Sequence, residues 1–242
     1  DQAEYSGPFF PYLGYETGNT AALNAYRVFL QNIPEGDGHF WSSFEMNGEL
    51  TCCGADRGDA AMIAFGASHF AMAAGNKDIA VELWPLIEWS LDYCERQKNE
   101  EGVIQSDSDE MEGRIPTGNA NLSTSSLYYG ALLLAADLGR EINVPSKQLR
   151  AYEKKAEELD VAIENYFGAT IEGLETYRYF KGHDYVRHWI CLPLVMGINK
   201  RKAGTLDALF SKLWTNNGVR VEYNPALTEP DLFWDRGTLY AF

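Results

Sequence analysis

The sequence has few cysteines, few basic residues and no long apolar run. Its four cysteines in 242 residues are too few for a disulfide scaffold, and none has the spacing of a zinc site. No apolar stretch reaches the roughly 18 residues that a membrane-spanning helix needs. The net charge of −15 disfavours nucleic acid and anionic membranes as partners and favours a neutral small molecule or polymer. An equally simple interpretation is that the charge serves solubility alone.

Several catalytic motifs are also missing. The chain has no G-x-S-x-G nucleophile motif, no glycine-rich phosphate loop and no H-E-x-x-H zinc motif. The four histidines are scattered at positions 39, 69, 183 and 188. The sequence therefore predicts neither a metal site nor a bound cofactor.

Helical periodicity dominates what is present, and two types of helix alternate. Residues 56–74 and 122–138 are rich in alanine and glycine and apolar on nearly all sides, which predicts helices that are buried on most sides. Residues 78–97 and 147–166 have one apolar face, as surface helices do. Further helices are expected at residues 19–33, 184–197 and 204–213 and from residue 235 onwards, with short strands at 175–180 and 219–223. The alternation predicts an all-α domain over residues 1–242, an (α/α) toroid with an inner and an outer ring of helices.

The loops of this toroid differ in length in a regular way. Loops that lead into the buried helices are long and cover residues 34–55, 99–121, 168–183 and 215–234. Because successive helices run in opposite directions, all four long loops should lie at one end. Structureless loops of about 20 residues are uncommon and usually functional, so we expect the functional site at that end.

Residues 105–121 form the most acidic of these loops and read Q-S-D-S-D-E-M-E-G-R-I-P-T-G-N-A-N. Crowded carboxylates raise the pKa of at least one member, and a protonated carboxyl is what a general acid needs near neutral pH. Two carboxylates that flank a glycosidic bond cleave it. The alternatives are a solvated acidic loop and a cation site, although the spacing is not that of an EF-hand. The charged residues of this loop are Asp107, Asp109, Glu110, Glu112 and Arg114.

The other long loops carry aromatic and polar residues that suit a sugar. Aromatic faces stack on sugar rings, and charged side chains hydrogen-bond hydroxyl groups. Candidate substrate-binding residues are Trp41, Asp56, Arg57, Arg178, Tyr179, His183 and Trp234, together with Asp107, Asp109 and Arg114. The simpler interpretation is that both tryptophans only pack the loops onto the helices. A D-R-G triplet at 56–58 recurs at 235–237, and each is expected to open a buried helix, where Asp56 could be just an N-cap.

Two stretches, D-E-M-E-G-R-I-P-T-G-N-A-N-L-S-T-S-S at 109–126 and L-F-W-D-R-G-T-L-Y-A at 232–241, together with the alternating helices, resemble the six-hairpin glycosidase superfamily, which includes glucoamylase and trehalase. The resemblance implies an inverting glycoside hydrolase that acts on a carbohydrate. It implies Glu110 or Glu112 as the acid and Asp235 or Glu222 as the base. Six hairpins need twelve helices and eight are expected here, so we expect a partial toroid that continues beyond residue 242 and could leave one catalytic partner outside this sequence.

Glu112 is the favoured acid. Gly113 lets the backbone turn, so that Arg114 can fold back toward Asp107 or Asp109 and leave Glu112 without a partner. An unpaired carboxyl in a partly dry cleft is the one that keeps its proton.

Two other functions remain open. A uronic-acid hydrolase or lyase on the same scaffold would use arginines near the loops to hold a sugar carboxylate. The candidates are Arg178, Arg187, Arg220 and Arg236. A toroid that only binds carbohydrate or protein is the other possibility, and the sequence does not indicate an oligomeric state.

Overall fold

The computed structural model describes residues 2–40, 43–45, 47–52, 54–109, 111–226 and 232–241. Helices account for 58% of the residues, and the strands of the described residues form only two-stranded pairs. The all-α fold class expected from the sequence is therefore confirmed. No helix in these ranges is both long and apolar enough to cross a membrane.

Helices α3 (Asp59–Ala74) and α5 (Leu122–Glu141) form the centre of the core and pack against each other. Most of their residues are buried, whereas α4 (Lys77–Arg96) and α6 (Ser146–Phe167) bury one face and expose the other. The alternation of buried and one-sided helices is confirmed for these four. A plain solenoid, in which the four would be equally exposed, is thereby excluded.

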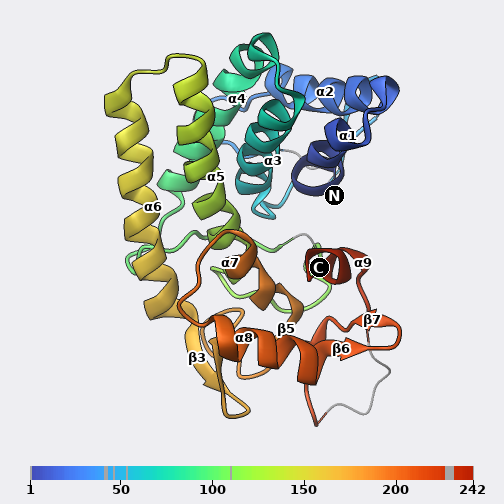
Figure 1. Cartoon of the computed structure of the whole chain (residues 1–242), viewed down its shortest axis with the longest axis vertical. Helices are drawn as coiled ribbons and strands as arrows, with labels where there is room; N and C mark the ends of the chain where they lie inside the picture. The colour runs from blue at the N-terminus through green and yellow to red at the C-terminus, as the bar shows by residue number, and fades with distance from the viewer. Residues whose placement is uncertain are drawn as a thin grey trace.

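The remaining helices continue this two-layer arrangement (Figure 1). The inner layer runs from α1 to α3, α5, α7 and α9, and each member contacts the next. The outer layer contains α2, α4, α6 and α8. The bounds not yet given are α1 (Gly7–Leu13), α2 (Glu16–Gln31), α7 (Cys191–Val195), α8 (Lys202–Ala208) and α9 (Asp235–Tyr240).

Short irregular helices and strands complete the fold. A π-helical turn, η1 (Gln2–Ser6), precedes α1, a 3₁₀ turn, η2 (His188–Ile190), precedes α7, and a π-helical turn, η3 (Leu209–Leu213), follows α8. The strand pairs are β1 (Ser43–Phe44) with β2 (Leu50–Cys52), β3 (Gly168–Ile171) with β4 (Leu174–Tyr177), β5 (Val186–Arg187) with β8 (Glu222–Tyr223), and β6 (Trp214–Thr215) with β7 (Gly218–Val219).

The structure corrects several expected elements. The helix expected at 184–197 is reduced to residues 188–195, because residues 186 and 187 form a strand instead. The strand expected at 175–180 is residues 174–177, and that at 219–223 is split between β7 and β8. Residues 2–13 form helices that the sequence did not predict, since Pro8 and Pro11 interrupt the usual pattern.

The long loops meet at one end of the helices, as expected. The backbone N–H of Asp56 donates to Oδ2 of Asp107 at 2.9 Å, and the N–H of Ser108 donates to the carbonyl of Asp56 at 3.0 Å. The N–H of Leu122 donates to the carbonyl of Tyr179 at 2.9 Å. Three loops that are far apart in the sequence are therefore joined through their backbones.

The start of α3 depends on Gly58, and the interpretation of Asp56 as the N-cap of this helix is wrong. Gly58 is the capping residue and has a φ of 77°. A Cβ at this position would also lie 2.4 Å from Oγ1 of Thr124. Asp56 instead accepts a hydrogen bond from the N–H of Gly58 at 2.8 Å, in a turn before the helix.

We expect Gly66→Ala to destabilise the fold more than Gly130→Ala. A Cβ at Gly66 would lie 1.6 Å from the backbone oxygen of Ala3, which cannot move without displacing η1. At Gly130 the nearest atom is Sδ of Met196, the end of a flexible side chain. Overpacking lowers the free energy of unfolding by about 1 to 3 kcal/mol, whereas the helix propensity of alanine raises it by about 1 kcal/mol relative to glycine. Urea unfolding of both variants measures the difference, and equal free energies of unfolding would contradict this packing.

Candidate functional site

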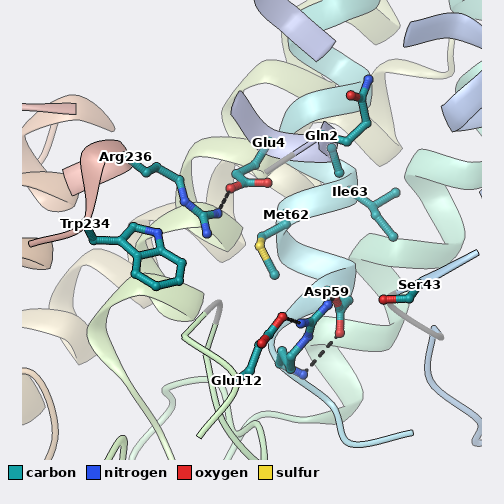
Figure 2. Close-up of a pocket in the computed structure, with 11 residues that line it drawn as sticks. Gln2, Glu4, Ser43, Asp59, Met62, Ile63, Glu112, Trp234 and Arg236 are labelled. Carbon is teal, nitrogen blue, oxygen red and sulfur yellow. Dashed lines mark hydrogen bonds and ion pairs between the residues drawn. The ribbon is translucent and has the colours of Figure 1, made fainter. Parts of the chain in front are cut away.

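A cavity of about 240 Å³ opens where η1, the start of α3, the acidic loop and the start of α9 meet (Figure 2). It is called the Glu112 pocket below. Its described lining residues are Gln2, Ala3, Glu4, Ser43, Arg57, Asp59, Met62, Ile63, Glu112, Trp234 and Arg236. The pocket thus brings together Arg57, Glu112 and Trp234, which were predicted as site residues, and Arg236, which was a candidate for holding a sugar carboxylate.

Arg57 lies between two carboxylates of this pocket. Its Nη1 is 2.7 Å from Oε1 of Glu112, and its Nη2 is 3.7 Å from Oδ1 of Asp59. Its backbone N–H also donates to Oδ2 of Asp59 at 3.2 Å. Two carboxylates that share one guanidinium group are held close together despite their like charge.

Glu112 projects from a tight turn of the acidic loop. Its φ is 61° and that of Gly113 is 73°, both in the left-handed region. This conformation is uncommon for a residue other than glycine and marks strain that the surroundings must hold in place. Gly113 therefore permits the turn, as the sequence suggested.

The expectation that Glu112 has no partner is wrong. Nη2 of Arg114 lies 3.0 Å from Oε2 of Glu112 instead of folding back toward Asp107 or Asp109. With Arg57 on its other oxygen, Glu112 is held by two arginines. The geometric argument for Glu112 as the acid, which rested on a missing partner, is thereby removed.

Asp59 is a pocket carboxylate that the sequence analysis missed. It is buried in the first turn of α3. Burial raises the pKa of Asp59 to about 6, against the lowering effect of Arg57. An acidic residue at the start of an otherwise apolar helix could have indicated Asp59 as a site residue. The sequence analysis counted it only as part of the helix.

The far wall of the pocket joins the two ends of the described chain. Glu4 of η1 and Arg236 of α9 form a buried ion pair, which Figure 2 shows. The guanidinium of Arg114 lies 5.5 Å from the ring centre of Trp234, so the acidic loop also contacts the segment before α9. Trp234 is partly exposed at the pocket, where an aromatic face can stack on a sugar ring.

Asp109 attaches the acidic loop to the protein core. It is fully buried, and its Oδ2 accepts a hydrogen bond from the hydroxyl of Tyr179 at 2.5 Å, while its Oδ1 accepts from the N–H of Met111 at 2.9 Å. Burial raises the pKa of Asp109, and the hydrogen bond from Tyr179 opposes that rise. Tyr179 is itself fully buried, so in this structure it supports the loop and does not reach the pocket.

Glu222 belongs to a second ion-pair cluster. Its Oε2 lies 2.7 Å from Nε2 of His183 and 2.7 Å from Nη2 of Arg187. Arg187 also donates to the carbonyl of Pro116 at 2.6 Å, which ties the cluster to the acidic loop. Burial acts to raise the pKa of Glu222, but hydrogen bonds from His183 and Arg187 outweigh it and lower the pKa to about 2.

The other predicted residues lie elsewhere. Asp56 and Asp107 line a separate cavity, and Asp235 lines a third one beside α9. Arg178, His183 and Glu222 are not among the described residues that line the Glu112 pocket. Trp41 and Glu110 fall outside the described residues, so their predicted roles stay predictions.

Comparison with known proteins supports the fold alone. No protein-family model matches the chain, and no curated protein matches it. A bacterial glucoamylase complexed with acarbose matches with a TM-score of 0.64 and 13% identity, over 94% of this chain and 36% of that chain. A sugar epimerase from a ruminal bacterium has a TM-score of 0.63 and 12% identity, over 93% and 62%.

A rhamnosidase from Klebsiella oxytoca with rhamnose bound has a TM-score of 0.54 and 15% identity, over 72% of this chain and 34% of that chain. The chain thus spans between about a third and three fifths of the length of these three structures. It has the (α/α) toroid fold of these structures, which the sequence resemblance implied.

We expect Tyr179→Phe to lower the free energy of unfolding by about 1 to 3 kcal/mol, because it leaves Oδ2 of the buried Asp109 without its hydrogen-bond donor. Tyr166→Phe is the matched control, since the Tyr166 hydroxyl makes no hydrogen bond with the described residues. Chemical denaturation of both variants measures the effect. An equal effect of the two substitutions would show that Tyr179 does not anchor the loop.

Glu222→Gln should destabilise the protein near neutral pH and much less in acid. A carboxylate with a lowered pKa contributes stability above its ordinary pKa of 4.5, and the contribution is lost as the pH falls toward about 2. The difference between wild type and variant should be on the order of 2 kcal/mol at pH 6. Thermal or urea unfolding between pH 6 and pH 2 measures it, and a difference that does not depend on pH would refute the ion-pair origin.

Proposed function

We propose that the Glu112 pocket hydrolyses a glycosidic bond of a neutral sugar, with Asp59 as general acid and Glu112 as general base. One observation carries this proposal. A buried carboxylate, Asp59, and an exposed one, Glu112, lie on either side of Arg57 in a cavity that Trp234 also lines, and burial raises the pKa of Asp59 to about 6. Glycosidases place such a pair on the two sides of the scissile bond.

Asp59 suits the acid. Burial raises its pKa from the ordinary 3.8 to about 6, and Asp56 and Glu4 nearby add to that rise, so Asp59 keeps its proton to a higher pH than an ordinary aspartate. The proton would pass from Asp59 to the oxygen of the leaving group as the bond to the anomeric carbon breaks.

Glu112 suits the base. It lies in contact with Arg57 and Arg114, and its side chain is 45% exposed, so water can reach it. Glu112 would accept a proton from a water molecule whose oxygen attacks the anomeric carbon. Attack from the face opposite the leaving group inverts the configuration.

The structural neighbours and the arginines favour a neutral saccharide. The glucoamylase was solved with acarbose and the rhamnosidase with rhamnose. Arg187 and Arg236, which a uronate would need, are already paired with Glu222 and Glu4. The epimerase among the neighbours shows that this fold is not confined to hydrolases, so the chemistry must be tested directly.

Asp59→Asn should lower turnover of glycosides with poor leaving groups at least about a hundredfold, because the proton donor is lost. Dinitrophenyl glycosides, whose leaving group departs without a proton, should be affected much less. Glu112→Gln should lower turnover of both kinds of substrate, because the water is no longer activated. A panel of glucosides and rhamnosides with both kinds of leaving group provides the measurement.

Asp78→Asn is the matched control, since Asp78 lies in the first turn of α4 and is exposed. Turnover of poor-leaving-group substrates by the wild type should fall as the pH rises through about 6, where Asp59 loses its proton. Equal losses on both substrate kinds in the Asp59 variant would refute the acid role. No turnover of any glycoside by the wild type would refute hydrolysis itself.

A further inference from the structure

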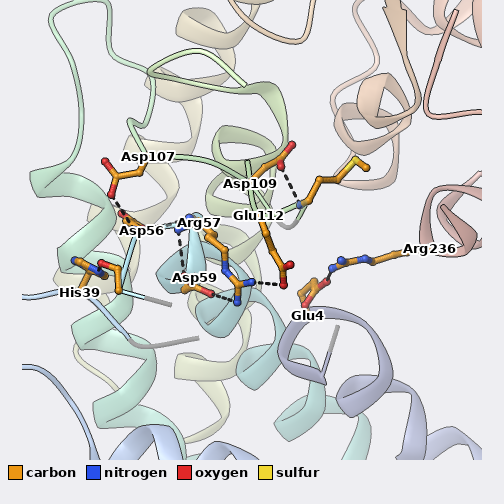
Figure 3. A network of polar contacts seen from close by, with 12 residues as sticks. Glu4, His39, Asp56, Arg57, Asp59, Asp107, Asp109, Glu112 and Arg236 are labelled. Carbon is orange, nitrogen blue, oxygen red and sulfur yellow. Dashed lines mark hydrogen bonds and ion pairs between the residues drawn. The ribbon is translucent and has the colours of Figure 1, made fainter. Parts of the chain in front are cut away.

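A second and larger cavity, of about 490 Å³, lies next to the Glu112 pocket. The two share no described lining residue. Figure 3 shows His39, Asp56 and Asp107 on one side of Arg57, with Glu112 and Arg236 on the other. The segment that leads into α3 therefore separates the two cavities, and the second one plays no part in the proposed hydrolysis.

Three amide side chains line this cavity, and the backbone holds them side by side. The N–H of Gln105 donates to the carbonyl of Gln97 at 3.0 Å, and the N–H of Ser106 donates to the carbonyl of Asn119 at 3.2 Å. The side chains of Gln97, Gln105 and Asn119 make no hydrogen bond with the described residues. Each presents one donor group and one acceptor group that a ligand can use.

The wall behind these amides is rigid because its polar groups are already paired. Asp56 is buried and accepts hydrogen bonds from the hydroxyl of Tyr93 at 2.7 Å and from the N–H of Gly58. Oδ2 of Asp107 accepts from the N–H of Asp56, and Nε2 of His39 lies 2.6 Å from the carbonyl of Gly54. The cavity is thus formed before any ligand binds. Binding to a preformed site requires little ordering of side chains, so little binding free energy is lost to conformational entropy.

The lining selects a ligand by its charge and polarity. The described lining contains no lysine or arginine, so an anion finds no countercharge. No group of three or more His, Cys, Asp or Glu side chains in the described residues is placed to hold a metal ion. The lining side chains are polar, with Tyr93 as the one aromatic among those described. The volume lies in the range of small-molecule sites, about 300 to 1,000 Å³.

We propose that this cavity is a second binding site for a neutral saccharide, which Gln97, Gln105 and Asn119 hold by hydrogen bonds to its hydroxyl groups. Amides that both donate and accept match hydroxyl groups, which do the same. Asp37 and Asp107 at the rim add acceptors for further hydroxyl groups. The site stands independently of the chemistry proposed for the Glu112 pocket.

Nuclear magnetic resonance can test each pocket separately. Glucose, rhamnose and maltose are titrated into the wild-type protein, and the side-chain amide resonances of Gln97 and Asn119 are followed beside the indole N–H resonance of Trp234. At least one of these sugars should shift the two amide signals. Glucuronate and calcium ions should not. The indole signal reports the Glu112 pocket, so failure at one pocket is distinguishable from failure at the other.

The double substitution Gln97→Ala and Asn119→Ala should weaken binding of that sugar about tenfold, which corresponds to the loss of two ordinary hydrogen bonds. The matched control is Asn24→Ala with Gln31→Ala on the exposed face of α2, which should leave the affinity unchanged. The proposal is overturned if no neutral sugar shifts the amide signals, if only glucuronate or calcium does, or if both double variants bind equally well.

Discussion

Close packing of α3 against α5 is the constraint on which the site depends. Both helices are built mainly from small and apolar residues, so their backbones approach closely along the core. Gly58 lies against Thr124, which puts the starts of both helices at the same end. The loops that precede these helices are therefore held in contact. One loop contains Asp56, and the other contains Asp107 and Asp109. The Glu112 pocket and the second cavity, which Gln97, Gln105 and Asn119 line, both form where these loops are in contact.

An imbalance of charge gives the Glu112 pocket its chemical character. Its described lining holds the carboxylates of Glu4, Asp59 and Glu112 but only two guanidinium groups, those of Arg57 and Arg236. Arg236 is engaged by Glu4, and Arg57 lies closer to Glu112 than to Asp59. Asp59 is therefore a buried carboxyl whose contact with Arg57 is the longer of the two, and burial raises its pKa to about 6.

The sequence predicted the pairs of helices and the end of the fold that carries the loops, because periodicity and loop length are local properties. It also pointed to Arg57, Glu112 and Trp234. It missed Asp59, which reads as one more residue of a helix, and Glu4, which lies in a proline-interrupted segment where no helix was expected. It assigned Glu112 no partner, because which arginine reaches which carboxylate depends on side-chain directions in a turn with positive φ. Burial and pairing of this kind arise only when distant segments pack.

The ion pair between Glu4 and Arg236 joins residues 232 positions apart. Helical hairpins such as α3 with α4 and α5 with α6 assemble from neighbouring segments, whereas a contact of this separation pays the loop-closure entropy of almost the entire chain. Both partners line the Glu112 pocket, so the pocket becomes complete only after the helical hairpins are in place. We therefore expect a chain in which the hairpins are packed but this ion pair is not formed to lack the pocket, so that ligand binding there would report the fully native state.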